Sequence, residues 1–120
     1  MAAPNILAAT SIIGKSAGFD LDTTTTTTLL TCASEKLYKI NSIICANVDG
    51  AAAVEVTISW YDGSNDRHLA KGVSVPAKST LIVLGKDAPI YLEEGHSIRG
   101  GASANSDAEV LICYEILDDA

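Results

Sequence analysis

The sequence predicts an all-β protein: a single antiparallel β-sandwich of about seven or eight strands, with jelly-roll or immunoglobulin-like topology. Three observations lead to this prediction. Several segments alternate apolar and polar residues with the period of two that half-buried strands show. These segments follow one another about every eight to fifteen residues, with turn-forming residues between them. No segment keeps the period of an amphipathic helix.

Length and charge narrow the choice of function. The 120 residues suit one domain over residues 1–120, which can bury a core without disulfides or a metal. The net charge of −7 disfavours binding to nucleic acid or to an anionic membrane surface. No apolar run is long enough to span a bilayer. Charged residues make up only 19% of the chain, which favours association with other protein surfaces.

The first segment, residues 1–14, is apolar and precedes the first basic residue, Lys15. A secretory signal normally begins with a positive region, so we do not expect one here. We expect the segment to form the first strand of the sandwich or an arm that contacts a neighbouring subunit.

Six consecutive threonines follow, Thr23 to Thr28. Threonine is β-branched and favours strands, whereas flexible linkers are rich in glycine, serine or proline. We therefore predict a strand over Asp20–Cys32, polar on both faces and near a sheet edge, where another chain can pair with it. A flexible surface loop is the alternative interpretation.

The strand predicted over Leu37–Val48 directs alternate side chains to the core and to the outside. Its inward set is Tyr38, Ile40, Ile44, Ala46 and Val48. Its outward set is Lys39, Asn41, Ile43, Cys45 and Asn47. The next strand, Val54–Tyr61, directs Val54, Val56, Ile58 and Trp60 inward and ends at a turn over Asp62–Asp66.

The second half of the chain continues the pattern. His68–Pro76 and Ser79–Gly85 are predicted strands, and two shorter strands flank a turn at Glu94-Gly95. The tripeptide at Arg99 to Gly101 is more typical of a strand bend or turn than of an RNA contact in an acidic chain. The last strand, Glu109–Leu117, has one inward set: Val110, Ile112, Tyr114 and Ile116.

Apolar residues interrupt two of the predicted outward faces. Because an apolar cluster on neighbouring strands indicates an interaction surface, these residues and the threonines are the candidates for a subunit interface. The candidate residues are Thr24, Thr26, Thr28, Ile43, Cys45, Leu111 and Cys113.

No pattern predicts catalysis. The chain has three cysteines, an odd number, and they are widely spaced: Cys32, Cys45 and Cys113. We therefore expect free thiols rather than a disulfide framework or a zinc site. His68 and His96 lack a nucleophile motif and are expected to be exposed. The Asp62–Asp66 loop offers oxygen atoms but lacks calcium-loop spacing. We therefore predict no enzyme, no cofactor and no metal.

Three stretches of the sequence carry a family resemblance: YKINSIICANVDGAAAVEVTISWYD, VSVPAKSTLIVLGKDAPIYLEEGHSIRG and AEVLICYEIL. Together they resemble small β-sandwich structural proteins of tailed bacteriophages, in particular those of cyanophages, over about residues 37–117. The resemblance rests on short strand and turn sequences, namely VPAKSTL, IYLEEGHSI and the final YEI. It brings no catalytic residues.

The resemblance implies a virion protein assembled in the host cytoplasm. We expect a capsid decoration or cement protein that binds the major capsid protein as a homo-oligomer, with a trimer favoured. A neck, tail, baseplate or fibre component is an alternative. A third possibility is a carbohydrate-binding or adhesin module, for which Tyr61 is the only outward aromatic residue on its strand.

Overall fold

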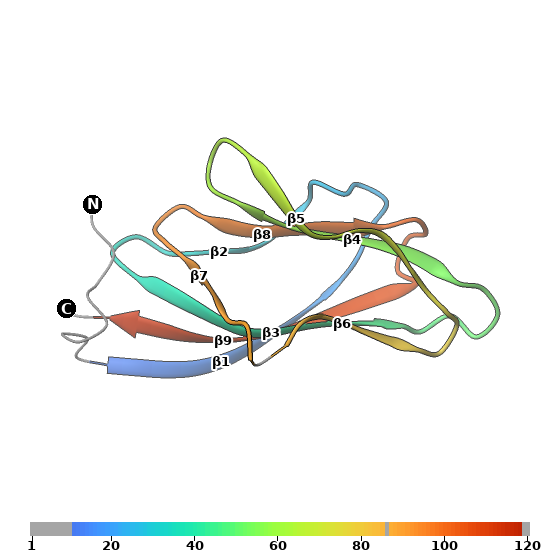
Figure 1. Ribbon diagram of the computed structural model, residues 1–120, viewed down its shortest axis with the longest axis horizontal. Coiled ribbons are helices and arrows are strands. Elements are labelled where there is room, and N and C mark those ends of the chain that lie inside the picture. The colour runs from blue at the N-terminus through green and yellow to red at the C-terminus, as the bar shows by residue number, and fades with distance from the viewer. Residues whose placement is uncertain (1–10, 86, 119–120) are drawn as a thin grey trace.

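The computed structural model describes residues 11–85 and 87–118, which form two antiparallel β-sheets packed face to face (Figure 1). This confirms the predicted all-β sandwich, and the described residues contain no helix. They form nine strands, slightly more than predicted. The strands are β1 (Ser11–Asp20), β2 (Thr28–Thr31), β3 (Leu37–Asn47), β4 (Val54–Tyr61), β5 (Asp66–Val75), β6 (Thr80–Leu84), β7 (Ile90–Leu92), β8 (Ser97–Ala102) and β9 (Ala108–Asp118).

The strand order resolves the topology. Sheet A has the order β1-β9-β3-β6, with β7 also paired to β3, and sheet B has the order β2-β8-β4-β5. The chain therefore forms one long antiparallel hairpin, in which β1 pairs with β9 and β2 with β8, rolled into two layers. With β7 set aside, this is the eight-stranded arrangement of a jelly roll. Of the two predicted topologies, the jelly roll is the one observed.

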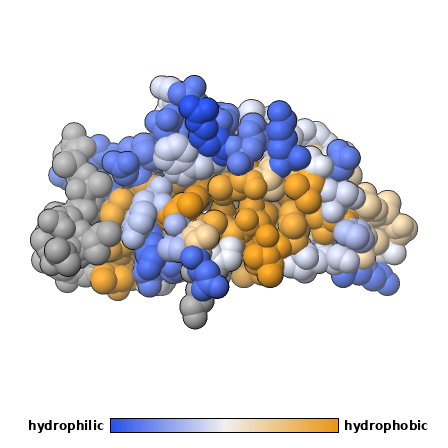
Figure 2. All heavy atoms as spheres, in the orientation of Figure 1, coloured by the Kyte–Doolittle hydropathy of each residue, from blue (hydrophilic) through white to orange (hydrophobic). Residues whose placement is uncertain are grey.

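The core lies between the two sheets. Alternate residues of β3, β4, β8 and β9 are fully buried there, because every second side chain of a strand points to the same face. Figure 2 shows that an apolar band also reaches the surface between the two layers. A groove of about 400 Å³ lies in the surface at one edge of the sandwich, lined by Trp60, Arg67, Leu69, Ile90 and Tyr91.

A β-bulge in β3 changes the predicted faces of that strand. Ile40 pairs with Tyr114 and Ser42 with Cys113, so Asn41 is an extra residue. Beyond the bulge, Ile43 and Cys45 point inward and have 0% of their surface exposed, so the prediction that they face outward is wrong. One extra residue reverses every later side chain of a strand. The predicted inward set was therefore wrong for Ile44, Ala46 and Val48.

The threonine tract is mostly a loop, so the predicted continuous strand over Asp20–Cys32 is wrong. Asp20 ends β1 in sheet A, and β2 begins only at Thr28, in sheet B. Asp22 holds the loop: its Oδ1 accepts hydrogen bonds from the Thr24 amide (3.0 Å) and from the Thr27 hydroxyl (2.9 Å). Such side-chain bonds stabilise turns in place of an extended backbone. The chain has to turn here because it crosses from one sheet to the other.

The loop lies over β8. The carbonyl of Asp22 accepts a hydrogen bond from the Ala102 amide, and the carbonyl of Thr27 accepts one from the Gly100 amide. In Figure 1 this loop, light blue, lies above β8 on the side away from sheet A. The part of the tract that does form a strand, β2, lies at the edge of sheet B, as predicted for the whole segment.

The other predicted strands are present. The two short strands around Glu94-Gly95 are β7 and β8, and β9 directs Val110, Ile112 and Tyr114 into the core as predicted. Of the predicted N-terminal strand or arm, residues 11–14 belong to β1 and residues 1–10 lie outside the described residues.

Asn47, the last residue of β3, connects the two sheets, although it was predicted to face outward. Its side chain is buried, and its Nδ2 donates hydrogen bonds to the carbonyls of Ala52 (3.0 Å) and Val75 (2.9 Å). Its Oδ1 accepts one from the Asp49 amide (2.9 Å). The amide thus satisfies backbone groups where sheets A and B meet, which a buried apolar residue could not do.

Candidate interaction surface

The outer face of sheet A, which points away from sheet B, carries a row of apolar residues across four strands. Gly18 of β1 pairs with Leu111 of β9, Leu111 pairs with Ile44 of β3, and Ile44 pairs with Ile82 of β6. Residues directly opposite in an antiparallel ladder share a face, so these four residues form one line, the apolar row. Ile82 is 67% exposed and Leu111 39%. Aligned apolar side chains on a sheet exterior indicate a contact surface.

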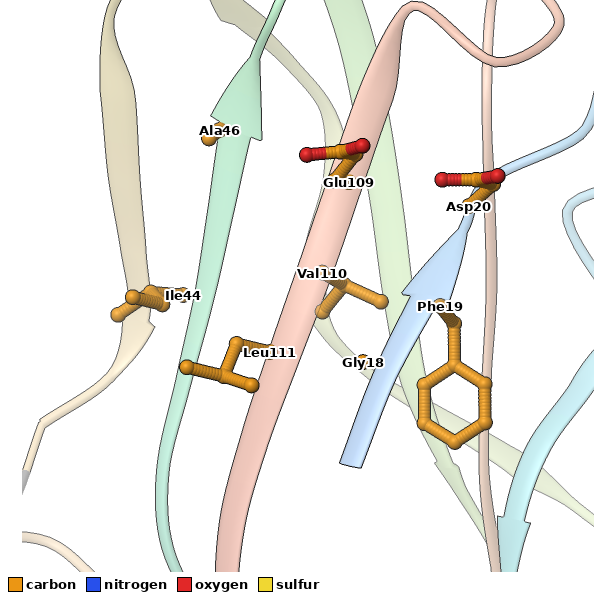
Figure 3. A pocket seen from close by; sticks show the side chains of 8 residues that line it. All are labelled: Gly18, Phe19, Asp20, Ile44, Ala46, Glu109, Val110 and Leu111. Atoms are coloured by element: carbon orange, nitrogen blue, oxygen red, sulfur yellow. The ribbon is translucent and has the colours of Figure 1, made fainter. Parts of the chain in front are cut away.

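A shallow groove of about 390 Å³ runs beside the apolar row (Figure 3). Gly18 leaves it open, because a Cβ atom at this position would have no neighbour nearer than 3.9 Å. The lining residues are Gly18, Phe19, Asp20, Ile44, Ala46, Glu109, Val110 and Leu111.

Two carboxylates lie at one end of this groove. Asp20 of β1 pairs directly with Glu109 of β9, so both side chains are on the outer face, and Figure 3 shows them next to one another. Among the described residues, neither forms a salt bridge; the ion pairs found there join Lys36 to Asp118 and Arg99 to Asp66. Like charges placed directly opposite on neighbouring strands destabilise a sheet. The pair therefore has a cost in the isolated chain.

The structure brings together only some of the predicted interface residues. Leu111 and Cys113 both lie on the outer face of sheet A, where Cys113 pairs with Ser16 and Ser42. Ile43 and Cys45 are in the core instead. The three threonines Thr24, Thr26 and Thr28 belong to the loop and strand at the edge of sheet B, so they are not continuous with Leu111.

Sequence reasoning missed Ile44 and Ile82 as members of this surface. The alternation in Leu37–Val48 placed Ile44 in the core because nothing in the sequence marks the bulge at Asn41. For β6, the signal was visible, since apolar residues occur on both faces of STLIVLG. That pattern alone does not say which face is exposed.

The thiols do not form a reactive centre. All three cysteines are free. Burial raises the pKa of the Cys32 thiol from its ordinary 9.0 to about 11, and that of the Cys45 thiol to about 12. Both remain protonated at neutral pH, and the thiolate is the nucleophilic form. Cys113 is partly exposed and accepts a hydrogen bond from the Ser16 hydroxyl at 3.5 Å.

We expect a thiol reagent at pH 8 to modify Cys113 alone in the native protein and all three cysteines after denaturation. The physical reason is that Cys32 and Cys45 are both buried and protonated, whereas Cys113 is partly exposed. Mass spectrometry of the labelled peptides measures this. Cys113→Ser serves as the control and should remove native labelling. Rapid native labelling of Cys45 would contradict the observed packing.

The other candidate groups have structural roles. Asp62 Oδ1 accepts hydrogen bonds from the amides of Ser64 (2.9 Å) and Asn65 (2.8 Å), and these amides lower the pKa of Asp62. This is the turn between β4 and β5. His68 is exposed as predicted, whereas His96 is partly buried, with its ring edge-on to Trp60 at 5.1 Å. No group of three metal-ligating residues occurs within residues 11–85 and 87–118.

Tyr61 and Arg99 form a cluster on the exterior of sheet B. The Arg99 guanidinium lies 3.4 Å from the centre of the Tyr61 ring and 3.2 Å from Asp66 Oδ2. One face of Tyr61 is thus occupied and cannot stack on a sugar. Gly100 and Gly101 lie within β8, so this tripeptide is not a turn; both are buried where other backbone comes close.

No helix in the described part of the chain is long and apolar enough to cross a membrane. No family model matches the sequence, and no curated protein matches it.

Several solved structures are similar to the fold. A chain in the acidic stable capsid structure of Helicobacter pylori bacteriophage KHP30 is 8% identical, with a TM-score of 0.55 over 93% of this chain and 91% of that one. A chain from the disulfide-linked pili of Bacillus endospore appendages is 15% identical, with a TM-score of 0.48 over 92% and 90%. A pentameric capsid protein from metagenomic phage sequences is 23% identical, with a TM-score of 0.41 over 87% and 64%. At its low identity, the first likeness shows a shared fold.

Proposed function

We propose that this protein is a non-enzymatic structural component of a bacteriophage virion. In particular, we propose a capsid decoration protein that binds the shell of major capsid proteins through the outer face of sheet A. It acts as a homo-oligomer, with a trimer as the expected state. The observation that carries the proposal is the apolar row Gly18–Leu111–Ile44–Ile82 on the outer face of sheet A, in which Ile82 and Leu111 are exposed.

The shape of this surface favours a macromolecular partner. A small-molecule site is normally a deep cavity that encloses its ligand, whereas this groove is shallow and continues into a flat sheet face. An apolar row that crosses four neighbouring strands and exposes Leu111 and Ile82 suits a second protein surface. The shared fold with the phage KHP30 capsid chain supports the same conclusion.

Copy number tests the position in the virion. Particles of the phage that encodes this chain should contain hundreds of copies, measured by quantitative mass spectrometry against the major capsid protein. A few tens of copies would assign the chain to the neck, tail, baseplate or fibre instead. Absence from the particle would overturn the proposal, and so would specific glycan binding by the isolated protein without particle binding.

A surface variant tests the docking face. Leu111→Asp should abolish binding of the protein to particles that lack it, because a charge in the apolar row is desolvated on contact. Thr31→Asp on β2 adds the same charge to the exposed surface of sheet B, opposite the uncharged Ser97, and should leave binding unchanged. Equal loss of binding in both variants, with both still folded, would count against sheet A as the docking face.

A further inference from the structure

The groove beside the apolar row is apolar along its walls and anionic at one end. Along its length the walls are aliphatic, formed by Leu111, Ile44 and Ala46, and Gly18 leaves room for a chain of methylene groups. At one end stand the carboxylates of Asp20 and Glu109. Apolar walls with anionic groups at one end complement a side chain that has an aliphatic stem and a cationic head.

Within residues 11–85 and 87–118, no lysine or arginine forms an ion pair with Asp20 or Glu109. Lys15 is on the same strand as Asp20, but it pairs with Tyr114, whose side chain is buried, and so belongs to the opposite face of β1. Lys39 shares the outer face, but it pairs with Glu115, beyond the row of Cys113. The repulsion between Asp20 and Glu109 is therefore not relieved by either lysine.

We propose that this groove receives a lysine or arginine side chain from the protein on which the chain docks. The stem of such a side chain covers Leu111 and Ile44, and its cationic head lies between the two carboxylates. A second copy of this chain is a poor occupant because its net charge of −7 opposes an anionic groove. The inference rests on the proposed function for the identity of the partner, and adds the chemistry by which that partner is recognised.

A double variant tests whether the groove binds a cationic side chain, without disturbing the fold. The double variant D20N/E109Q keeps the shape of the groove and removes its charge. Because it also removes a like-charge repulsion, its melting temperature should stay equal or rise, while binding to particles weakens about tenfold. Raising the salt concentration should weaken wild-type binding and affect the double variant much less.

Replacements of glycine test whether the aliphatic stem of the partner's side chain lies in the groove. Gly18→Val fills the groove, and Gly14→Val is its matched control, since both glycines are exposed on the outer face of β1 and a Cβ at position 14 meets nothing within 4 Å. Gly18→Val should weaken binding about tenfold, and Gly14→Val should leave it unchanged.

The outcomes separate the two proposals. If D20N/E109Q binds particles as tightly as the wild type while Leu111→Asp abolishes binding, the cationic occupant is wrong and the docking face stands. If Gly18→Val binds particles as tightly as the wild type, the proposal that a side chain occupies the groove is also wrong. If the wild-type protein does not bind the particles at all, the proposed function fails and the occupant fails with it.

Discussion

Replacing Ile43 with alanine is expected to lower the free energy of unfolding by about 2–5 kcal/mol. The side chain has no exposed surface and belongs to the central core cluster between the two sheets. Removing three of its carbon atoms loses the transfer free energy of those atoms and leaves a cavity that a close-packed interior only partly fills. Chemical denaturation monitored by the fluorescence of Trp60 would measure the change.

Ile44→Ala is the matched control, because it makes the same chemical change one residue later. Ile44 lies on the outer face of sheet A, so the loss should stay within about 1 kcal/mol. The difference between the two variants tests the bulge at Asn41. A larger loss for Ile44 than for Ile43 would mean that β3 has the unbroken alternation that the sequence suggests.

Alanine at Gly100 or Gly101 is expected to destabilise the protein by about 1–3 kcal/mol or more. A Cβ at position 100 would lie 2.7 Å from the carbonyl oxygen of Thr57 and 2.6 Å from Ile58 Cδ1. At position 101 it would lie 2.7 Å from the carbonyl carbon of Thr24, in the threonine loop. Gly101→Ala should therefore loosen that loop, measurable as faster hydrogen exchange of the Ala102 amide, which is bonded to it.

The sign of the effect makes this a sharp test. Glycine inside a strand is normally unfavourable, so replacing it with alanine should stabilise the protein wherever space allows. Gly14→Ala on β1 meets that condition and should be neutral or stabilising by up to about 1 kcal/mol. A similar gain from Gly100→Ala would contradict the close approach of β4 to β8.

The sequence predicted most strands because alternation is a local signal. In Val54–Tyr61 and in Glu109–Leu117, neighbouring positions differ in hydropathy, and the observed strands β4 and β9 bury most of the expected residues. The exceptions lie near the strand ends, where Trp60 and Ile116 are only half-buried, whereas Ser59 and Leu117 are buried although they were predicted to face outward. The turn at Asp62–Asp66 was equally visible, since an aspartate that bonds to the amides two and three residues later needs no distant partner. The threonine tract was wrongly predicted as a continuous strand from its composition. Its high β-propensity did not prevail, because the chain has to cross from sheet A to sheet B at this point.

The candidate surface was only half predictable. Leu111 and Cys113 were correctly assigned to an outward face, because β9 alternates regularly from Ala108 to Glu115. Ile43 and Cys45 were assigned wrongly, because the face of each residue beyond Asn41 depends on a bulge. A bulge forms where the partner strand requires it, and that partner is about seventy residues away in the chain.

By itself, the sequence determined the all-β class, the positions of most strands, the acidic charge and the absence of a recognisable catalytic motif. Only the tertiary structure decided which strands are neighbours, and with them the apolar row, the open groove at Gly18 and the facing carboxylates of Asp20 and Glu109. The physical reason is the range of the interactions. Hydropathy alternation acts between adjacent residues, whereas a surface on a jelly roll is assembled by pairing strands from opposite ends of the chain.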